Sequence, residues 1–416
     1  KRSRDDDDEA PVRTGLSYPA NRDGWVRMIK DLGMQFNFVS ADQMEKAELT
    51  PSKYKVMILP FSSALSDEEV RDLAAFAQAG GVVIADGAAG IMDQHCAWQQ
   101  GATINDFFGI TAPLSSNRAA IKPFSANVSI TAEGARWGMA AKDLTGISAA
   151  EPNIKATTGT PLIRIGNADG VIVRRVGKGW AVYLNTFLHD YAKQRAEKFG
   201  GENYRSLVGA LLAHVGVEPT ERVLGADGKR LPQAQVVRYR FGGAQILTIV
   251  KDNVALEGIA QRDGVTTYND AALGQIARQD ISIKLPGKFY VTDIRSGQRL
   301  GYTDSVRSSV IIGDALVLGL SPDDNKINIG GPTSASFGEH VKFKLDSSVR
   351  GPRLIRCQVF DPNGAILPVY AGNLLVQTTA ATFVLPFALN DAAGVYTVTA
   401  TDVITGASAR AKITLK

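Results

Sequence analysis

Acidic and histidine side chains gather directly after one strongly apolar segment. The run Val82–Ala85 is followed by Asp86, and Asp93 and His95 come shortly afterwards, with glycines between them. Open α/β sheets bind ligands at the carboxyl ends of their strands, so these side chains could line a pocket there that contacts a sugar or a metal ion. We take them as candidate substrate contacts. The alternative is a loop that packs against a neighbouring domain or subunit.

One cysteine and one histidine have the types that nucleophilic catalysis requires. Cys96 could supply a thiolate, and His189, which follows an apolar run at 179–185, could act as its base. The alternative is a half-buried thiol and a loop histidine, and both are common in proteins. The sequence favours this alternative, so we assign no catalytic residue and keep His189 as a candidate substrate contact.

Aromatic side chains could stack on sugar rings. Candidates of this kind are Trp98, Trp137, Trp180 and Tyr191. Packing in a core or an interface is favoured for each of them taken singly. Trp98, three residues after His95, is the one that we add to the candidate substrate contacts.

Composition and spacing exclude several chemistries. Two cysteines far apart exclude a disulfide scaffold and a cysteine zinc site, and the four histidines lack metal-ligand spacing. Residues 177–179 lack the spacing of a phosphate loop, and residues 323–325 lack that of a calcium loop. We therefore predict no metal and no cofactor.

A net charge of +4 without a basic stripe predicts no nucleic-acid partner. No apolar stretch approaches the roughly 20 residues that span a bilayer.

The elements that must position these residues alternate between strand and helix patterns from 11 to 219. Strands are predicted at 12–18, 36–39, 55–60, 82–85 and 179–185. Helices are predicted at 21–33, after a capping box from Ser66 to Glu69, and at 204–215. Continuous apolar strands with helices between them predict a doubly wound sheet that is covered on both faces.

The rest of the chain predicts two all-β domains. Residues 220–325 show short strand patterns and predict an antiparallel β-sandwich, and residues 331–416 predict a separate immunoglobulin-like β-sandwich. Within the second block, Asp361–Gly364 predicts a turn between two strands. Residues 1–10, basic and then acidic, predict a linker or a processed end, and they favour a large domain upstream.

Three segments together resemble a known family. They lie at 21–40, 54–86 and 105–110. Each is a pattern of apolar residues interrupted by glycines, such as Ala79-Gly-Gly-Val-Val-Ile-Ala-Asp86. The first half of the chain resembles the β-galactosidase trimerisation domain that follows the catalytic barrel in family 42-type glycoside hydrolases. The resemblance implies a class I glutamine-amidotransferase-like, flavodoxin-like fold. It also implies a following β-sandwich, which the stretch at 289–301 resembles.

The resemblance implies an accessory and assembly region of a glycoside hydrolase that acts in carbohydrate degradation. It implies a homo-oligomer, with a trimer favoured, and an upstream catalytic barrel that is either covalent or separate. Residues 1–416 show no barrel pattern, and the paired acids Glu68 and Glu69 fit the first turn of a helix. We therefore assign no pair of catalytic glutamates.

Two other functions stay open. A diverged amidotransferase-like enzyme needs a cysteine in the sharp turn after Val82–Ala85, where this sequence reads Asp86-Gly-Ala-Ala-Gly90. A Cys96–His189 dyad would lack the geometry of that turn. The other alternative is a non-catalytic surface, structural or carbohydrate-binding module. The β-sandwich tail favours an exported bacterial protein, with a cytoplasmic location as the alternative.

One apolar segment lies outside the regular strand–helix pattern. Between His95 and Ile110 the sequence places the apolar residues Trp98, Ile104, Phe107 and Phe108 close together. We expect a neighbouring subunit to cover this surface, because burial stabilises by about 25 cal/mol per Å² of apolar area. The alternative is that the upstream barrel or the β-sandwich covers this surface within one chain.

Overall fold

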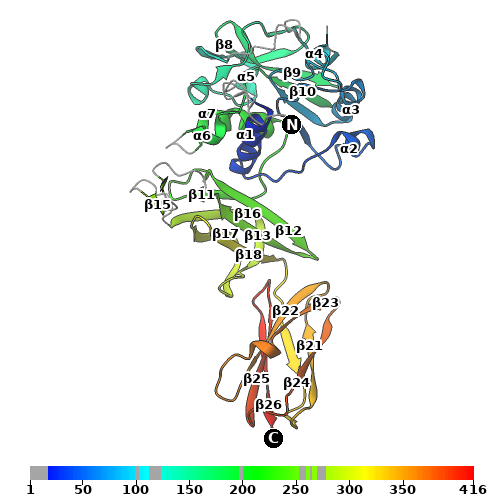
Figure 1. The fold of residues 1–416 in the computed structure, drawn as a ribbon, viewed down its shortest axis with the longest axis vertical. Helices are drawn as coiled ribbons and strands as arrows, with labels where there is room; N and C mark the ends of the chain where they lie inside the picture. The colour runs from blue at the N-terminus through cyan, green and yellow to red at the C-terminus, as the bar shows by residue number, and fades with distance from the viewer. Residues whose placement is uncertain are drawn as a thin grey trace, which may run out of the picture. The chain divides into compact units, whose positions relative to one another are not determined.

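The computed structural model describes residues 17–99, 103–111, 123–195, 200–252, 259–262, 265–268 and 278–416. The chain divides into two compact units, of which the first ends at Pro219 and the second begins at Thr220. Figure 1 shows helices and strands together in the first unit and mostly strands in the second. The predicted linker at 1–10 lies outside the described residues, and so does most of the predicted strand at 12–18.

A six-stranded sheet forms the centre of the first unit. In spatial order its strands are β1 (Val56–Leu59), β2 (Val82–Asp86), β10 (Gly179–Leu184), β9 (Ala168–Val176), β8 (Thr160–Ile165) and β5 (Val128–Ile130). β1, β2 and β10 run parallel, whereas β9, β8 and β5 continue the sheet antiparallel. Because a tight turn at Gly177 (φ +55°) joins β9 to β10, no crossover helix lies between them. Parallel pairing is thus confined to one half of the sheet.

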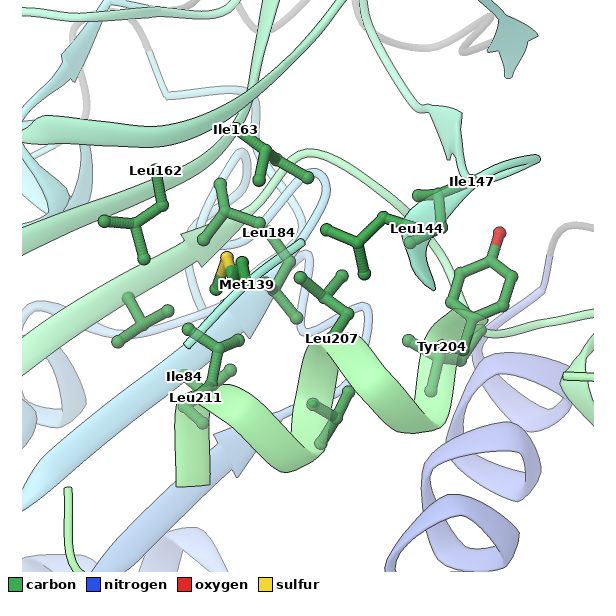
Figure 2. Packing of buried hydrophobic residues seen from close by; sticks show 14 of the residues in the cluster. Ile84, Met139, Leu144, Ile147, Leu162, Ile163, Leu184, Tyr204, Leu207 and Leu211 are labelled. Carbon is green, nitrogen blue, oxygen red and sulfur yellow. The ribbon is translucent and has the colours of Figure 1, made fainter. Parts of the chain in front are cut away.

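Helices cover both faces of the parallel strands. The helix α3 (Asp67–Gln78) packs on one face, and α1 (Tyr18–Asp31) and α7 (Glu202–His214) pack on the other. Figure 2 shows Leu207 and Leu211 of α7 beside Ile84 and Leu184. Val83, the neighbour of Ile84 along β2, packs in the cluster on the α3 side. This two-sided burial explains why the strands are apolar at consecutive positions.

Shorter elements complete the first unit. They are α2 (Ala41–Glu45), α4 (Thr103–Phe108), α5 (Ala132–Arg136), α6 (Tyr191–Gln194), a 3-10 helix at Ala141–Leu144, β3 (Ile110–Thr111), β4 (Phe124–Ser125), β6 (Ser148–Ala149) and β7 (Lys155–Ala156). Among the described residues of the whole chain, no helix is long and apolar enough to cross a membrane.

Several sequence predictions for the first unit are confirmed. The strands predicted at 55–60, 82–85 and 179–185 are β1, β2 and β10, and the helix predicted at 204–215 is α7. The predicted capping box is also present: the Glu69 amide donates to Ser66 Oγ at 3.1 Å, and the Ser66 amide donates to Glu69 Oε2 at 2.8 Å. The helix predicted at 21–33 begins earlier, at Tyr18, because Ser17 caps it and a proline lies in its first turn.

The predicted strand at 36–39 is wrong. This segment belongs to no sheet, and the side chains of Phe36 and Phe38 are 38% and 69% exposed. Their rings instead contact each other edge to face, with centroids 5.6 Å apart. Only Val39 packs against the core. The segment has the alternation of a strand, but β1 lies at the sheet edge and pairs with no described strand except β2.

The expectation that a neighbouring subunit covers the apolar segment at 95–110 is also wrong for most of its residues. Ile104, Phe107, Phe108 and Ile110 are buried in the core on the α3 side of the sheet. Phe108, for example, contacts the ring of Tyr183 at a centroid distance of 5.7 Å. The short helix α4 turns these side chains inward, so the domain covers them itself.

The first part of the second unit is an antiparallel sheet of six strands. They are β11 (Arg222–Gly225), β12 (Ala234–Phe241), β13 (Ala244–Lys251), β16 (Gln279–Asp293), β17 (Gln298–Val310) and β18 (Ala315–Ser321), with β14 (Ile259–Arg262) and β15 (Val265–Tyr268) forming a separate pair. The long β16 pairs with β11 near its start and with β18 near its end. One long strand, Gln279–Asp293, therefore takes part in both pairings.

The last part of the chain contains two sheets around one core. One sheet holds β19 (Ile327–Gly330), β21 (His340–Ser347) and β24 (Ala380–Pro386); the other holds β20 (Ser334–Ala335), β26 (Ser408–Leu415), β25 (Gly394–Asp402), β22 (Arg353–Phe360) and β23 (Gly372–Val376). Phe343, Cys357 and Tyr396 are buried between them. The predicted turn at Asp361–Gly364 is confirmed, since Asp361 Oδ1 accepts hydrogen bonds from the Asn363 and Ala365 amides.

A buried ion pair fixes α1 to the end of α6. Asp31 accepts hydrogen bonds from Arg195 Nε at 2.8 Å and from the Tyr191 hydroxyl at 2.7 Å, and both carboxylate and guanidinium are fully buried. Burial and the charge of Asp31 raise the pKa of Tyr191 above its ordinary value, so this hydroxyl stays a donor. Removing one partner of such a pair leaves the other charge buried and uncompensated.

We expect Asp31→Asn to lower the free energy of unfolding of the first unit by about 3–5 kcal/mol, because Arg195 loses its counter-charge. The measurement is urea unfolding followed by tryptophan fluorescence, which reports on this unit because Trp25, Trp98, Trp137 and Trp180 all lie in it. The matched control is Asp23→Asn, which removes an exposed pair with Arg27 on the same helix and should cost less than about 1 kcal/mol. Equal losses for the two variants would contradict this account.

Candidate functional site

A sharp turn follows β2 at the carboxyl end of the parallel strands. Ala88 has a φ of +64° there, the left-handed region that disfavours every residue with a side chain except in special contexts. The Ala88 amide donates to the Tyr183 hydroxyl at 3.3 Å, which holds the turn against β10. A Cβ at Gly87 would lie 2.6 Å from the Phe187 ring, so only glycine fits beside it. The turn has the shape that can present a nucleophile, but Ala88 offers a buried methyl group.

Asp86, the last residue of β2, is fully buried and collects three hydrogen bonds. Its Oδ2 accepts from the Asn21 amide and, at 2.6 Å, from Trp25 Nε1. Its Oδ1 accepts from the Phe61 backbone amide at 2.5 Å. Asn21 in turn accepts a hydrogen bond from the Leu188 amide at 2.7 Å, through its own carbonyl oxygen. The carboxylate therefore joins α1 to the loops that follow β1 and β10.

The environment of Asp86 changes its acidity. Burial raises the pKa of this carboxyl to about 7, although the hydrogen bonds from Asn21, Trp25 and Phe61 each act to lower it. Such a shifted acid in a cleft would be a candidate for catalysis. Asp86 has no exposed surface, however, so no ligand reaches it in this structure.

Three predicted residues lie together on one surface turn. Asp93 Oδ1 accepts hydrogen bonds from the amides of His95 and Ala97, each at 2.9 Å, and this organises the turn. His95 is exposed, and Trp98 at the end of the turn is 41% exposed. Cys96, at the tip with a φ of +61°, is exposed as well. The turn thus presents an imidazole, a thiol and an indole to solvent.

His189 lies in the loop after β10. Its Nε2 is 3.2 Å from Asp190 Oδ2, and its ring contacts that of Phe187 with centroids 6.3 Å apart. Its buried Nδ1 has no hydrogen-bond partner among the residues that the structure describes. Since Phe187 also abuts Gly87, this loop packs beside the turn after β2.

The remaining aromatic candidates are mostly internal. Trp137 and Tyr191 are 2% and 1% exposed, and Trp137 stacks on the His214 ring at a centroid distance of 3.8 Å. Trp180 is half-buried beneath the guanidinium of Arg175, which lies 4.9 Å from the ring centroid. For Trp137 and Tyr191 the packing alternative therefore holds.

The structure thus separates residues that the sequence grouped. Asp93, His95 and Trp98 share the turn at 91–99, whereas Asp86 is internal. Cys96 lies on that same turn, eight positions beyond Ala88, and so outside the sharp bend. The described residues contain no group of three or more histidine, cysteine or acidic side chains arranged to hold a metal ion.

The sequence analysis missed Asn21 and Trp25 as partners of Asp86. Both are buried in α1, where Asn21 is the first residue of the helix predicted at 21–33 and Trp25 lies one turn further on. Residues four apart lie on one face of a helix, so Asn21 shares a face with Trp25. Since a tryptophan usually marks the buried face, this spacing could have predicted that Asn21 is a buried polar partner. Phe61 carried no such signal, because it contributes only its backbone amide.

We expect Asp86→Asn to remove one pH dependence from the stability of the first unit. A pKa of about 7 in the folded chain, against 3.8 ordinarily, means that folding takes up a proton between these values. The free energy by which protonated Asp86 stabilises the folded unit is therefore complete below about pH 4. It falls as the pH rises, and it is gone above about pH 7. Between pH 5 and pH 8 the free energy of unfolding of the wild type should fall by roughly 2–3 kcal/mol relative to that of the variant.

Urea unfolding followed by tryptophan fluorescence at several pH values gives this difference directly. Asp93→Asn is the matched control, because that carboxylate is not buried and only organises a surface turn. If the curves of wild type and Asp86→Asn ran parallel from pH 5 to pH 8, Asp86 would be ionised throughout and the argument from burial would fail.

Comparisons with known proteins agree with this architecture. The family model described as the β-galactosidase trimerisation domain matches residues 3–218. No curated protein matches the chain. Among solved structures, a β-galactosidase from Bacillus circulans sp. alkalophilus superposes with a TM-score of 0.51 at 14% identity, over 74% of this chain and 38% of that one.

A second solved structure gives a similar comparison. A β-galactosidase from Rahnella sp. R3 matches at 15% identity with a TM-score of 0.48, over 73% of this chain and 37% of its own. The chain therefore spans less than two-fifths of the length of these proteins. With the family model covering more than half of its residues, the chain belongs to the β-galactosidase trimerisation domain family.

Proposed function

We propose that this chain is the accessory and assembly region of a glycoside hydrolase that acts in carbohydrate degradation, and that a separate or covalently attached barrel performs the catalysis. The observation that carries the proposal is the family match over residues 3–218. The buried state of Asp86 and the methyl group at Ala88 support it, because neither residue offers an accessible reactive group at the usual ligand-binding edge of the sheet. A bacterial, exported location is part of this proposal.

The same proposal includes three domains, at 11–219, 220–325 and 331–416. A flavodoxin-like, amidotransferase-like fold for the first is supported by the parallel strands β1, β2 and β10 with helices on both faces. An immunoglobulin-like fold for the last is supported by its two sheets and by the Tyr396 hydroxyl. This hydroxyl donates to the Ala392 carbonyl at 2.9 Å, as in a tyrosine corner.

The assembly surface that we propose is the edge of the sheet at β1. Strand β1 pairs only with β2, so no described strand covers its other edge, and another chain could pair with it. The exposed rings of Phe36 and Phe38 lie in the segment that leads to Val39, which packs in the same core as Met57 of β1. Exposed phenylalanine rings are costly in water, and a second copy of the chain would cover them.

We expect Phe38→Asp to shift the chain from an oligomer, with a trimer favoured, towards a monomer. A charge at the centre of an apolar contact loses the burial energy and must itself be desolvated. Multi-angle light scattering at tens of micromolar gives the mass of each species.

Val369→Asp is the matched control, because Val369 is 80% exposed and belongs to the second unit. It should leave the mass unchanged. A wild type that is monomeric under these conditions would overturn the assembly proposal, whereas an unchanged oligomer in Phe38→Asp would overturn only the choice of surface.

A carbohydrate contact at the turn 91–99 is the second candidate function, favoured by the exposed Trp98 next to His95. Sugars stack on exposed indoles, so galacto-oligosaccharides should quench or shift tryptophan fluorescence, and Trp98→Ala should abolish the change. Trp180→Ala is the control, because that ring is already covered by Arg175. An identical response from wild type and Trp98→Ala would exclude this contact, and would also remove His95 and Asp93, which share the turn with Trp98, from the candidate substrate contacts.

A further inference from the structure

One sheet of the last part of the chain has an outer face that carries only positive charge. The strands β22, β25 and β26 lie side by side, and every second residue points outward because side chains alternate along a strand. The outward positions include Arg356 on β22 and Arg410 and Lys412 on β26, all exposed. The register places Thr397 beside Lys412 and Thr399 beside Arg410.

These cations are unpaired. None of the three makes an ion pair among the described residues, and the outward positions of the three strands contain no aspartate or glutamate. On the other sheet, by contrast, the exposed Lys344 of β21 pairs with Asp346 at 3.1 Å. A face of one charge sign with no internal compensation attracts an anionic partner.

The face is also hollowed. A shallow cavity of about 430 Å³ lies between the turn at Asp361–Gly364 and the side chains of Arg410 and Lys412, with Thr397 and Thr399 among its lining residues. The carboxylate of Asp361 is the one acid at its rim, and its Oδ1 is occupied by the amides of Asn363 and Ala365. The hollow therefore offers two cations and the Thr397 hydroxyl to a ligand, beside the apolar side chains of Phe360, Pro362 and Val395. The hydroxyl of Thr399 is buried and donates to the Gln358 carbonyl.

The spacing of the cations favours an extended ligand over a small anion. Residues two apart on a strand are about 7 Å apart, and strands are about 4.8 Å apart. Arg410 and Lys412 are two apart, and Arg356 lies across β25 from them. One small anion cannot pair with all three, whereas a polymer with repeated anionic groups can. Guanidinium groups bind sulfate and carboxylate oxygens in a bidentate manner, and threonine hydroxyls match sugar hydroxyls.

We propose that this face of the β20–β26–β25–β22–β23 sheet binds an acidic polysaccharide, whose sulfate or carboxylate groups pair with Arg356, Arg410 and Lys412. The choice of a polysaccharide over another polyanion rests on the proposed role in carbohydrate degradation. The cationic face itself does not depend on that role. Binding through three cations implies that affinity falls steeply as the salt concentration rises.

The test uses the full chain in affinity gel electrophoresis and titration calorimetry with dextran sulfate, polygalacturonate, neutral dextran and duplex DNA. We expect dextran sulfate or polygalacturonate to bind at low salt and neutral dextran not to bind. The better of the two acidic probes identifies sulfate or carboxylate as the group recognised. The double variant Arg410→Glu with Lys412→Glu should raise the Kd by at least tenfold.

Lys342→Glu with Lys344→Glu is the matched control, because it makes the same change of charge on exposed positions of the other sheet of the same domain. It should bind as the wild type does, and melting curves establish that both double variants are folded. Equal losses in the two double variants would overturn the proposal, since net charge alone would then explain binding. Tighter binding of DNA than of both acidic polysaccharides would overturn it as well, without touching the assembly proposal, which the oligomeric mass tests.

Discussion

The first unit depends on one buried carboxylate. Asp86 ends β2 at the point where three parallel strands finish, and it holds Asn21 and Trp25 of α1 together with the amide after β1. Through Asn21 the same network reaches the loop after β10. A buried carboxylate is tolerated only with such a set of donors, so the positions of α1 and of both loops are fixed together. The edge where open α/β sheets usually admit ligands is here filled by the protein's own polar contacts.

The backbone around this network leaves little room for alternatives. A Cβ at position 24 would lie 1.9 Å from the Leu188 carbonyl oxygen, so glycine at this point of α1 allows the close approach that the Asn21 hydrogen bond requires. Ala88 keeps a left-handed conformation although it presents nothing reactive.

Which parts of the fold and of the site could be predicted from the sequence depends on how far apart in the chain the interacting residues lie. The strands β2 and β10 and the cap at Ser66 were predictable because continuous apolar runs and local capping pairs act within a few residues. The segment at 36–39 has the same local pattern, but a strand also needs a partner, and the sequence does not reveal that β1 remains an edge. Asp86 was predicted to bind a ligand because its true partners could not be recognised in the sequence. Its hydrogen-bond donors lie 25 to 65 residues away in the chain.

The two proposed surfaces use different physical forces, and this makes them separable. The exposed pair Phe36 and Phe38 is apolar, and burial of such rings is strengthened by salts that are excluded from protein surfaces. The face with Arg410 and Lys412 is charged and exposed, and its attraction for an anionic chain is screened within about 8–10 Å at physiological ionic strength. Raising the salt concentration should therefore release a polyanion while leaving self-association intact.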